Sequence, residues 1–202
     1  MTIIVDYNMG NLRSVQKSFE RINVDAKISD NPDDIISAEK LILPGVGHFS
    51  QGMKNLTAKG LISPLNKAVL EKKTPILGIC LGMQLMTKFS EEGNLKGLSW
   101  IDADVKKISV ENTNLRIPHM GWNSIDVLKS NSILNNIPQN NLLYFVHSYY
   151  VKCDNLDNVL ATTEYGIPFV SSFQNQNIFG CQFHPEKSYD DGLTILNNFN
   201  LM

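Results

Sequence analysis

The stretch that decides the fold is Pro75-Ile76-Leu77-Gly78-Ile79-Cys80-Leu81-Gly82-Met83-Gln84. Its first half is an apolar run of the length of a buried strand, and the residues from Leu81 to about Phe89 have the character of a helix. No linker separates the two. A strand that turns straight into a helix indicates an α/β fold, with Cys80 standing at the turn.

Residues 78–82 have the form G-x-C-x-G, which in this context predicts a nucleophile elbow at Cys80. So sharp a turn strains the central residue, and Gly78 and Gly82 let the two arms approach. The N–H groups and dipole at the start of the helix favour a thiolate, and the N–H of Leu81 can hold an oxyanion. An ordinary cysteine is more often a core residue; Cys153 and Cys181 are interpreted in that way.

A nucleophile needs a base, and the base needs a group that orients it. His184-Pro185-Glu186 offers both at the end of a strand, because the proline fixes the backbone between the two side chains. A lone histidine is more often structural, so this assignment depends on the pairing with Glu186. The other three histidines lack metal-ligand spacing, and we expect neither a metal nor a cofactor.

A second oxyanion site is expected at Pro44-Gly45-Val46-Gly47, with Gly45 and Val46 as the donors. In a doubly wound sheet the third and fourth strands deliver their carboxyl ends to one crevice. A plain Pro-Gly turn would account for the segment equally well.

The first half of the chain alternates between apolar runs and segments with apolar residues at helical spacing. The expected strands are 3–7, 24–28, 40–44 and 75–79, and the expected helices are 11–22, 61–70 and 81–89. This alternation predicts a mostly parallel sheet flanked by helices.

From about residue 103 the runs become strand-like, which predicts an antiparallel or mixed extension of the sheet. The expected strands are 103–108, 124–127, 142–151, 169–173 and 178–183, followed by a helix over 190–199. With 202 residues and no repeat or low-complexity tract, the chain is expected to form one domain over 1–202.

The composition of the chain argues against several classes of protein. A net charge of -2 gives no electrostatic footprint for nucleic acid or an anionic membrane. No stretch approaches the ~20 apolar residues of a membrane span, and the opening residues lack a targeting signal. Three widely spaced cysteines are no disulfide framework, so we expect a cytoplasmic protein.

With these segments in hand, the chain resembles the class I glutamine amidotransferases, whose two signatures are G-I-C-L-G-M-Q and F-H-P-E. It resembles most the glutaminase subunit of imidazole glycerol phosphate synthase. That likeness is carried by blocks 6–11, 44–49, 118–123, 144–149 and 184–188, and the resemblance runs from about residue 3 to 188 without a large gap.

The resemblance implies that the residue matching Cys80 forms a glutamyl thioester and that glutamine yields glutamate and ammonia. It places Gln84 and Glu92 at the glutamine head group, with Gly47 and the backbone of Ser148 and Tyr149 beside them. Gln84 is physically sensible, since it follows Cys80 by four residues on one helical face. Glu92 is equally readable as a solvated helix end, with Glu91 next to it.

The resemblance also implies a heterodimer with a (β/α)8-barrel cyclase, which uses the ammonia to make imidazole glycerol phosphate and aminoimidazole carboxamide ribotide for histidine synthesis. It places Asn11, Trp122, Tyr144 and Lys187 toward that partner or the ammonia exit. Trp122 and Tyr144 are also explained by packing, and a surface lysine needs no explanation.

Three other functions compete with this interpretation. A paralogue can carry the same motifs and feed ammonia to another acceptor, such as an amino-sugar enzyme. A non-catalytic regulatory module on the same fold would have no need of Cys80, His184 and Glu186 together. A cysteine peptidase would explain the cysteine and histidine but not Gln84 or residues 118–123.

Overall fold

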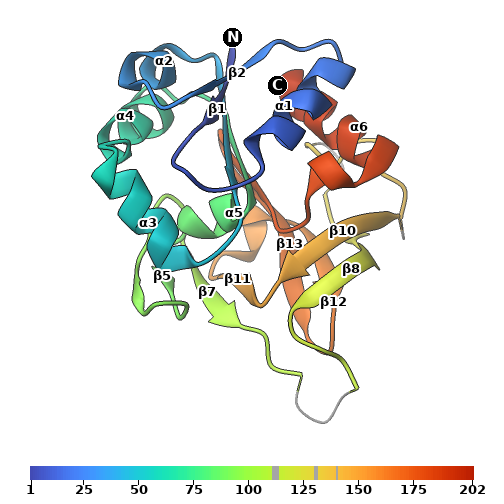
Figure 1. Cartoon of the computed structure of the whole chain (residues 1–202). Helices are drawn as coiled ribbons and strands as arrows, with labels where there is room; N and C mark the ends of the chain where they lie inside the picture. The colour runs from blue at the N-terminus through green and yellow to red at the C-terminus, as the bar shows by residue number, and fades with distance from the viewer. Residues whose placement is uncertain (111–113, 130–131, 140) are drawn as a thin grey trace.

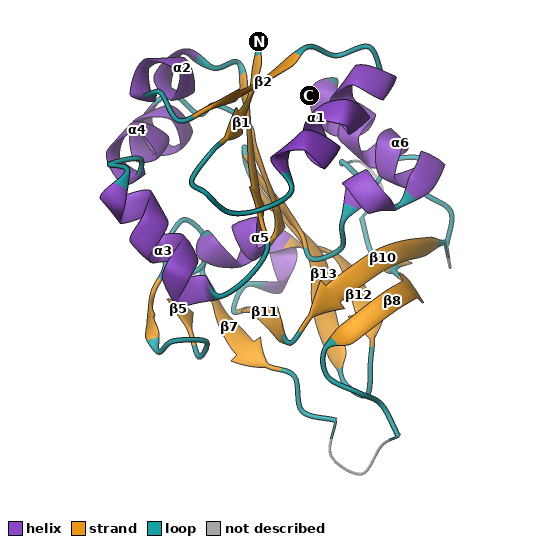
Figure 2. Cartoon of the chain, viewed as in Figure 1, coloured by secondary structure: helices purple, strands orange, loops and turns teal. Residues whose placement is uncertain are grey.

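The computed structural model describes residues 1–110, 114–129, 132–139 and 141–202. Figure 1 traces the chain, and Figure 2 shows a central sheet with helices on both sides. Its parallel half runs in the order β2-β1-β3-β4-β14. These strands are Thr2–Val5 (β1), Ala26–Ser29 (β2), Lys40–Gly45 (β3), Ile76–Cys80 (β4) and Ile178–Cys181 (β14).

The sheet continues from β14 through antiparallel pairs of β14 with β13, β13 with β11 and β11 with β7, which confirms the predicted change of character in the second half. The short strands β5 and β6 follow β7 at the edge of the sheet. The strands of this half are Phe89–Ser90 (β5), Leu95–Lys96 (β6), Ala103–Lys107 (β7), Asp126–Val127 (β9), Tyr149–Cys153 (β11), Val159–Glu164 (β12) and Pro168–Asn175 (β13).

A separate two-stranded sheet lies beside the main one. It pairs His119–Ser124 (β8) with Leu142–His147 (β10) in antiparallel register. The predicted single strand over 142–151 is therefore wrong, because the chain leaves one sheet at His147 and enters the other at Tyr149. Ser148 stands at the break, where its carbonyl oxygen accepts a hydrogen bond from the Ile108 N–H.

Helices cover both faces of the main sheet (Figure 2). Alternate residues of the parallel strands face opposite ways, so Ile3 and Leu41 enter one core and Ile4 and Ile42 the other. The first core packs under Pro32–Ser37 (α2), Phe49–Ala58 (α3), Ile62–Asn66 (α4), a π-helical turn over Lys67–Glu71, and Leu81–Leu85 (α5). The second packs under Leu12–Arg21 (α1) and Tyr189–Asn200 (α6).

The predicted helix over 81–89 is correct at its start and too long at its end. Helix α5 stops at Leu85, where returning residues take up its carbonyl groups: Leu98 N–H bonds the Leu85 oxygen and Trp100 N–H bonds the Met86 oxygen. Helices α2 and α3 were not predicted. In the part of the chain that is described, no helix combines the length and apolar character that crossing a bilayer would take.

Candidate functional site

The predicted elbow at Cys80 is present. Cys80 ends β4, α5 begins at Leu81, and the Cys80 backbone has a φ of 52°, which an L-residue adopts only under strain. The two flanking positions have no room for a side chain. A Cβ on Gly82 would lie 1.7 Å from the Leu43 carbonyl oxygen, and one on Gly78 would lie 2.7 Å from the Met83 nitrogen. The fold therefore holds Cys80 at the end of a sheet strand, with the start of a helix beside it.

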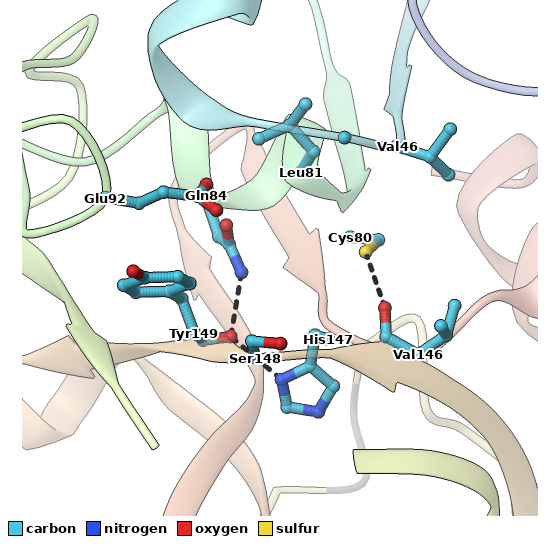
Figure 3. Close-up of a pocket in the computed structure, with 10 residues that line it drawn as sticks. Val46, Cys80, Leu81, Gln84, Glu92, Val146, His147, Ser148 and Tyr149 are labelled. Carbon is cyan, nitrogen blue, oxygen red and sulfur yellow. Dashed lines mark hydrogen bonds between the residues drawn. The ribbon is translucent and has the colours of Figure 1, made fainter. Parts of the chain in front are cut away.

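Cys80 opens into a cavity of about 150 Å³ (Figure 3). Its lining comes from four segments of the chain: Val46, Gly47, Cys80, Leu81, Gln84, Glu92, Val146, His147, Ser148 and Tyr149. Pockets for drug-sized ligands span about 300–1,000 Å³, so this one suits a molecule of amino-acid size. A cavity of this size does not suit the extended peptide that a cysteine peptidase would take.

His184 and Glu186 are brought together as predicted. His184 precedes a 3-10 turn over Pro185–Lys187, and its Nδ1 donates to Glu186 Oε1 at 2.8 Å, with both side chains at most 3% exposed. Its other ring nitrogen, Nε2, is buried and has no hydrogen-bond partner among the described residues. That nitrogen is available to exchange a proton with a reacting group.

Burial disfavours the charged form of His184, but the Cys80 sulfur and the Glu186 carboxylate outweigh burial and raise its pKa to about 10. The pair is thus arranged so that a proton moving from sulfur to imidazole is stabilised by Glu186.

The expected oxyanion donors flank the sulfur. Strands β3 and β4 pair in parallel with Gly45 opposite Cys80, and Val46 and Gly47 continue from there into the cavity lining. Leu81 occupies the first position of α5, where a backbone N–H has no intrahelical acceptor. Gly45 must be glycine, because a Cβ there would lie 2.2 Å from the Tyr7 hydroxyl oxygen.

Tyr7 was not singled out in the sequence. It is fully buried and its hydroxyl donates to the Pro44 carbonyl oxygen at 2.7 Å. The β1–α1 loop also approaches here, since a Cβ on Gly10 would lie 3.2 Å from the Gly45 Cα. The Tyr7 side chain and the β1–α1 loop therefore pack against the strand end that carries Gly45 and Val46 and hold it in place.

Gln84, expected at the glutamine head group, lies in the cavity wall. Its Nε2 donates to the Tyr149 carbonyl oxygen at 2.9 Å (Figure 3) and to Gln182 Oε1 at 3.0 Å. Both amide hydrogens are therefore used within the protein. Its Oε1 is left as the acceptor that a ligand can meet.

The neighbouring side chains of Glu92 and Glu91 lie in different parts of the structure. Glu92 lines the cavity, where its Oε2 accepts the Phe49 N–H at 2.7 Å, at the start of α3. Glu91 turns to β7, where it accepts the Lys107 N–H and pairs with Lys106. The interpretation of Glu92 as a solvated helix end is wrong, because it follows β5 in a turn and its carboxylate is held beside the cavity.

Gln182 was missed. It follows β14 directly, is fully buried, and its Nε2 donates to the Cys80 sulfur at 3.6 Å. A signal was present, because Gln182 is a polar residue within the apolar run that leads into His184. To place Gln182 beside Cys80 one needs the register of β14 against β4, which cannot be derived from the sequence.

Two further histidines are bonded to each other, and one of them, His147, lines the cavity. His147 Nδ1 donates to the Tyr149 carbonyl oxygen at 2.8 Å, its Nε2 accepts from His119 Nδ1 at 3.0 Å, and Asn123 Nδ2 lies 3.2 Å from His119 Nε2. Burial lowers the pKa of His119 to about 4 and that of His147 to about 3. Within the described residues no cluster of three or more possible ligands forms a metal site.

The residues expected at a partner surface lie partly together. Trp122 is 42% exposed, stacks on Tyr189 at 5.0 Å and meets Tyr144 edge-on at 5.9 Å, while the Lys187 Nζ lies 5.3 Å from the Tyr144 ring centre. Asn11 caps α1, which packs against the turn that carries Lys187. Trp122 packs against these rings at the surface, so packing in the core does not explain it.

With this geometry described, comparison with known proteins gives the family. The family Glutamine amidotransferase class-I matches residues 3–201. The chain is 50% identical over 199 residues to imidazole glycerol phosphate synthase subunit HisH 2 of Methanococcus maripaludis, and 48% identical over 200 residues to subunit HisH 1 of Campylobacter jejuni, covering 98% of each chain in both cases.

Solved structures show the same fold. PurLQS from Thermotoga maritima superimposes with a TM-score of 0.74 at 19% identity, covering 99% of this chain and 97% of that one. The glutaminase domain of CTPS from Trypanosoma brucei gives 0.66 at 15% identity, covering 99% and 93%. The chain therefore belongs to the class I glutamine amidotransferases and, within them, to the HisH subunits of imidazole glycerol phosphate synthase.

Proposed function

We propose that this glutaminase subunit hydrolyses glutamine at Cys80, with His184 as the base and Glu186 as the group that orients it. The observation that carries the proposal is the combination of three features around Cys80: its strained elbow at the cavity, the buried His184–Glu186 pair that interacts with its sulfur, and a His184 Nε2 with no hydrogen-bond partner among the described residues. The small cavity supports an amino-acid substrate.

The reaction follows from these positions. The Cys80 sulfur attacks the side-chain amide carbon of glutamine as its proton passes to His184, and the oxyanion is held by the N–H groups of Leu81 and of the Gly45–Val46 strand end. His184 returns the proton to the leaving nitrogen, so ammonia departs and a thioester remains. Water, deprotonated by His184, then attacks the thioester, releasing glutamate and restoring the thiol.

We assign the head group of glutamine to the part of the cavity that Gln84 and Glu92 line. The Glu92 carboxylate and Gln84 Oε1 are acceptors that suit its ammonium group. We assign Gly47 and the backbone of Ser148 and Tyr149 to the remaining contacts. The Tyr149 oxygen already accepts from Gln84 and His147, so its contribution is to hold those side chains.

We also propose that the chain works as one domain over 1–202, in a heterodimer with the cyclase, in the cytoplasm, and supplies ammonia for histidine synthesis. Support comes from the HisH relatives named as subunits of imidazole glycerol phosphate synthase. The exposed Trp122 with Tyr144 and Lys187 beside it offers a docking surface, and Asn11 lies on the neighbouring helix. All three cysteines are free thiols, as suits a reducing compartment.

The test is Cys80→Ala in the complex reconstituted with the cyclase, with Cys153→Ala as the matched buried-cysteine control. We expect Cys80→Ala to lower glutamine-dependent turnover by about 10,000-fold or more and to retain synthesis from added ammonia. Cys153→Ala keeps both activities. Glutamine-dependent turnover that survives in Cys80→Ala contradicts the mechanism, and glutamate release that the cyclase fails to stimulate points to another acceptor enzyme.

A further inference from the structure

Gln182 is placed beside the nucleophile by strand register. Strand β14 runs parallel to β4 with Cys181 opposite Ile79, so the next residue along, Gln182, comes alongside Cys80. Its neighbours Cys181 and Phe183 both enter the core under α1 and α6. Gln182 therefore faces the opposite side of the sheet, where α5 begins, and its side chain is fully buried there.

A buried amide is costly unless its N–H and C=O groups are bonded, and here the bonding directions follow from one backbone atom. The Tyr149 carbonyl oxygen can only accept, so the Gln84 atom 2.9 Å from it is the amide nitrogen. That nitrogen also lies 3.0 Å from the Gln182 amide, so the atom facing it is Oε1. The Gln182 nitrogen is then the atom that faces the Cys80 sulfur at 3.6 Å.

The sulfur consequently sits between an acceptor and a donor. Its thiol proton is directed to the Val146 carbonyl oxygen at 3.8 Å, while the Gln182 N–H points at the sulfur. Losing the proton removes the first bond and strengthens the second, because a hydrogen bond to a charged acceptor is the stronger kind. The donor from Gln182 thus favours the ionised sulfur over the neutral one.

We propose that Gln182 is a positioning residue for the glutaminase reaction: it holds the Cys80 sulfur, favours its ionised form, and ties it to Gln84 in the wall of the glutamine cavity. This inference rests on the proposed role of Cys80 as nucleophile. One side chain then joins the attacking atom to the residue assigned to the substrate's head group.

Two Gln182 variants separate this role from simple packing. Gln182→Met keeps the length and removes the amide. Gln182→Glu keeps the shape and the bond accepted from Gln84, and replaces the donor toward sulfur with an acceptor when ionised. Gln174→Met on β13 is the matched control, since within the described part of the chain the Gln174 side chain bonds to the Gln176 carbonyl oxygen of its own turn and to nothing at the cavity.

The first measurement is the rate of Cys80 carboxamidomethylation by iodoacetamide, followed by mass spectrometry between about pH 5 and 10 in the complex with the cyclase. We expect the midpoint of this profile to rise by roughly one pH unit or more in both Gln182 variants. Gln174→Met keeps the wild-type midpoint. If Gln182→Met does not fold, Gln182→Glu alone decides.

The second measurement is steady-state glutamine hydrolysis in the same complexes. We expect kcat to fall by roughly 10- to 100-fold, the range implied by one lost hydrogen bond to a charged group, with KM changing less. A lower kcat with an unmoved alkylation profile overturns the inference in favour of a structural role, and so does wild-type behaviour in both assays. Cys80→Ala is measured alongside as a control for the proposed function. If Cys80→Ala still hydrolyses glutamine, the proposed function itself is wrong; if it does not, the Gln182 variants test the inference alone.

Discussion

The hydroxyl of Tyr7 donates a 2.7 Å hydrogen bond to the carbonyl oxygen of Pro44, one residue before the glycine that lies opposite Cys80. Burial raises the pKa of Tyr7 far above its ordinary value, so the phenol stays a donor at every working pH. A side chain from the β1–α1 loop therefore helps to hold the strand end assigned to the oxyanion.

Tyr7→Phe should weaken both the fold and the reaction. The change leaves the Pro44 oxygen unsatisfied in the core, at a cost of about 1–3 kcal/mol in the free energy of unfolding, measured by urea titration. Because the strand end loses its clamp, we also expect kcat for glutamine to fall while synthesis from ammonia is retained. Wild-type kcat in a destabilised variant would show that the clamp serves stability alone.

Gly82→Ala should prevent the elbow from forming. Its Cβ would lie 1.7 Å from the Leu43 oxygen, which is backbone and cannot turn aside. We expect a loss of at least about 3 kcal/mol of stability, or no folded protein, with no glutaminase activity. Gly60→Ala is the control: its φ is 67° but the space around it is open, so it should cost only about 1 kcal/mol.

His119 and His147 should make the protein sensitive to acid. Burial lowers their pKa values to about 4 and about 3, below the ordinary 6.5, so the unfolded chain binds protons first as the pH falls. Stability is then complete above about pH 6.5 and is lost progressively toward pH 4.

His119→Phe tests this acid sensitivity through the slope of the unfolding free energy against pH, rather than through the unfolding free energy at one pH. It should reduce the change in unfolding free energy between pH 6.5 and 4 by up to about 1.4 kcal/mol per pH unit, whatever packing is lost. Urea titrations at several pH values give both slopes. Parallel curves for variant and wild type would mean that His119 does not titrate on unfolding.

Trp122→Ala should weaken docking and leave the isolated fold nearly intact. The ring is 42% exposed and packs on Tyr189 and Tyr144 at the surface. We expect Kd for the cyclase to rise roughly 10- to 100-fold, as for an aromatic anchor, measured by calorimetry. Leu156→Ala, 76% exposed on another element, serves as the control, and equal affinities for the two variants would contradict the assignment.

What the sequence predicted well is what depends on neighbours along the chain. The elbow needed only Gly78, Cys80 and Gly82 at a strand–helix junction, and the His184–Glu186 pair needed only a fixed two-residue spacing. The strand and helix alternation of the first half followed from hydrophobic period.

What it missed depends on segments that meet only in the fold. The break at Ser148 comes from pairing with two different partners, β8 before it and β7 after it. Gln182 needed the β14–β4 register, and the early end of α5 needed residues 97–101 to return to it. Helix α2 is too short for a period, although Asn31 before Pro32 was a capping signal that could have been read.

The pairing of Gly45 with Cys80 has a consequence for how this family tolerates change in length. The proposed nucleophile and the oxyanion donors proposed beside it are both placed by the same row of hydrogen bonds between β3 and β4. An insertion or deletion of one residue within either strand would slip that row and turn every later side chain to the opposite face. Point substitutions can accumulate in β3 and β4 one at a time, whereas natural or engineered length variation has to fall outside them.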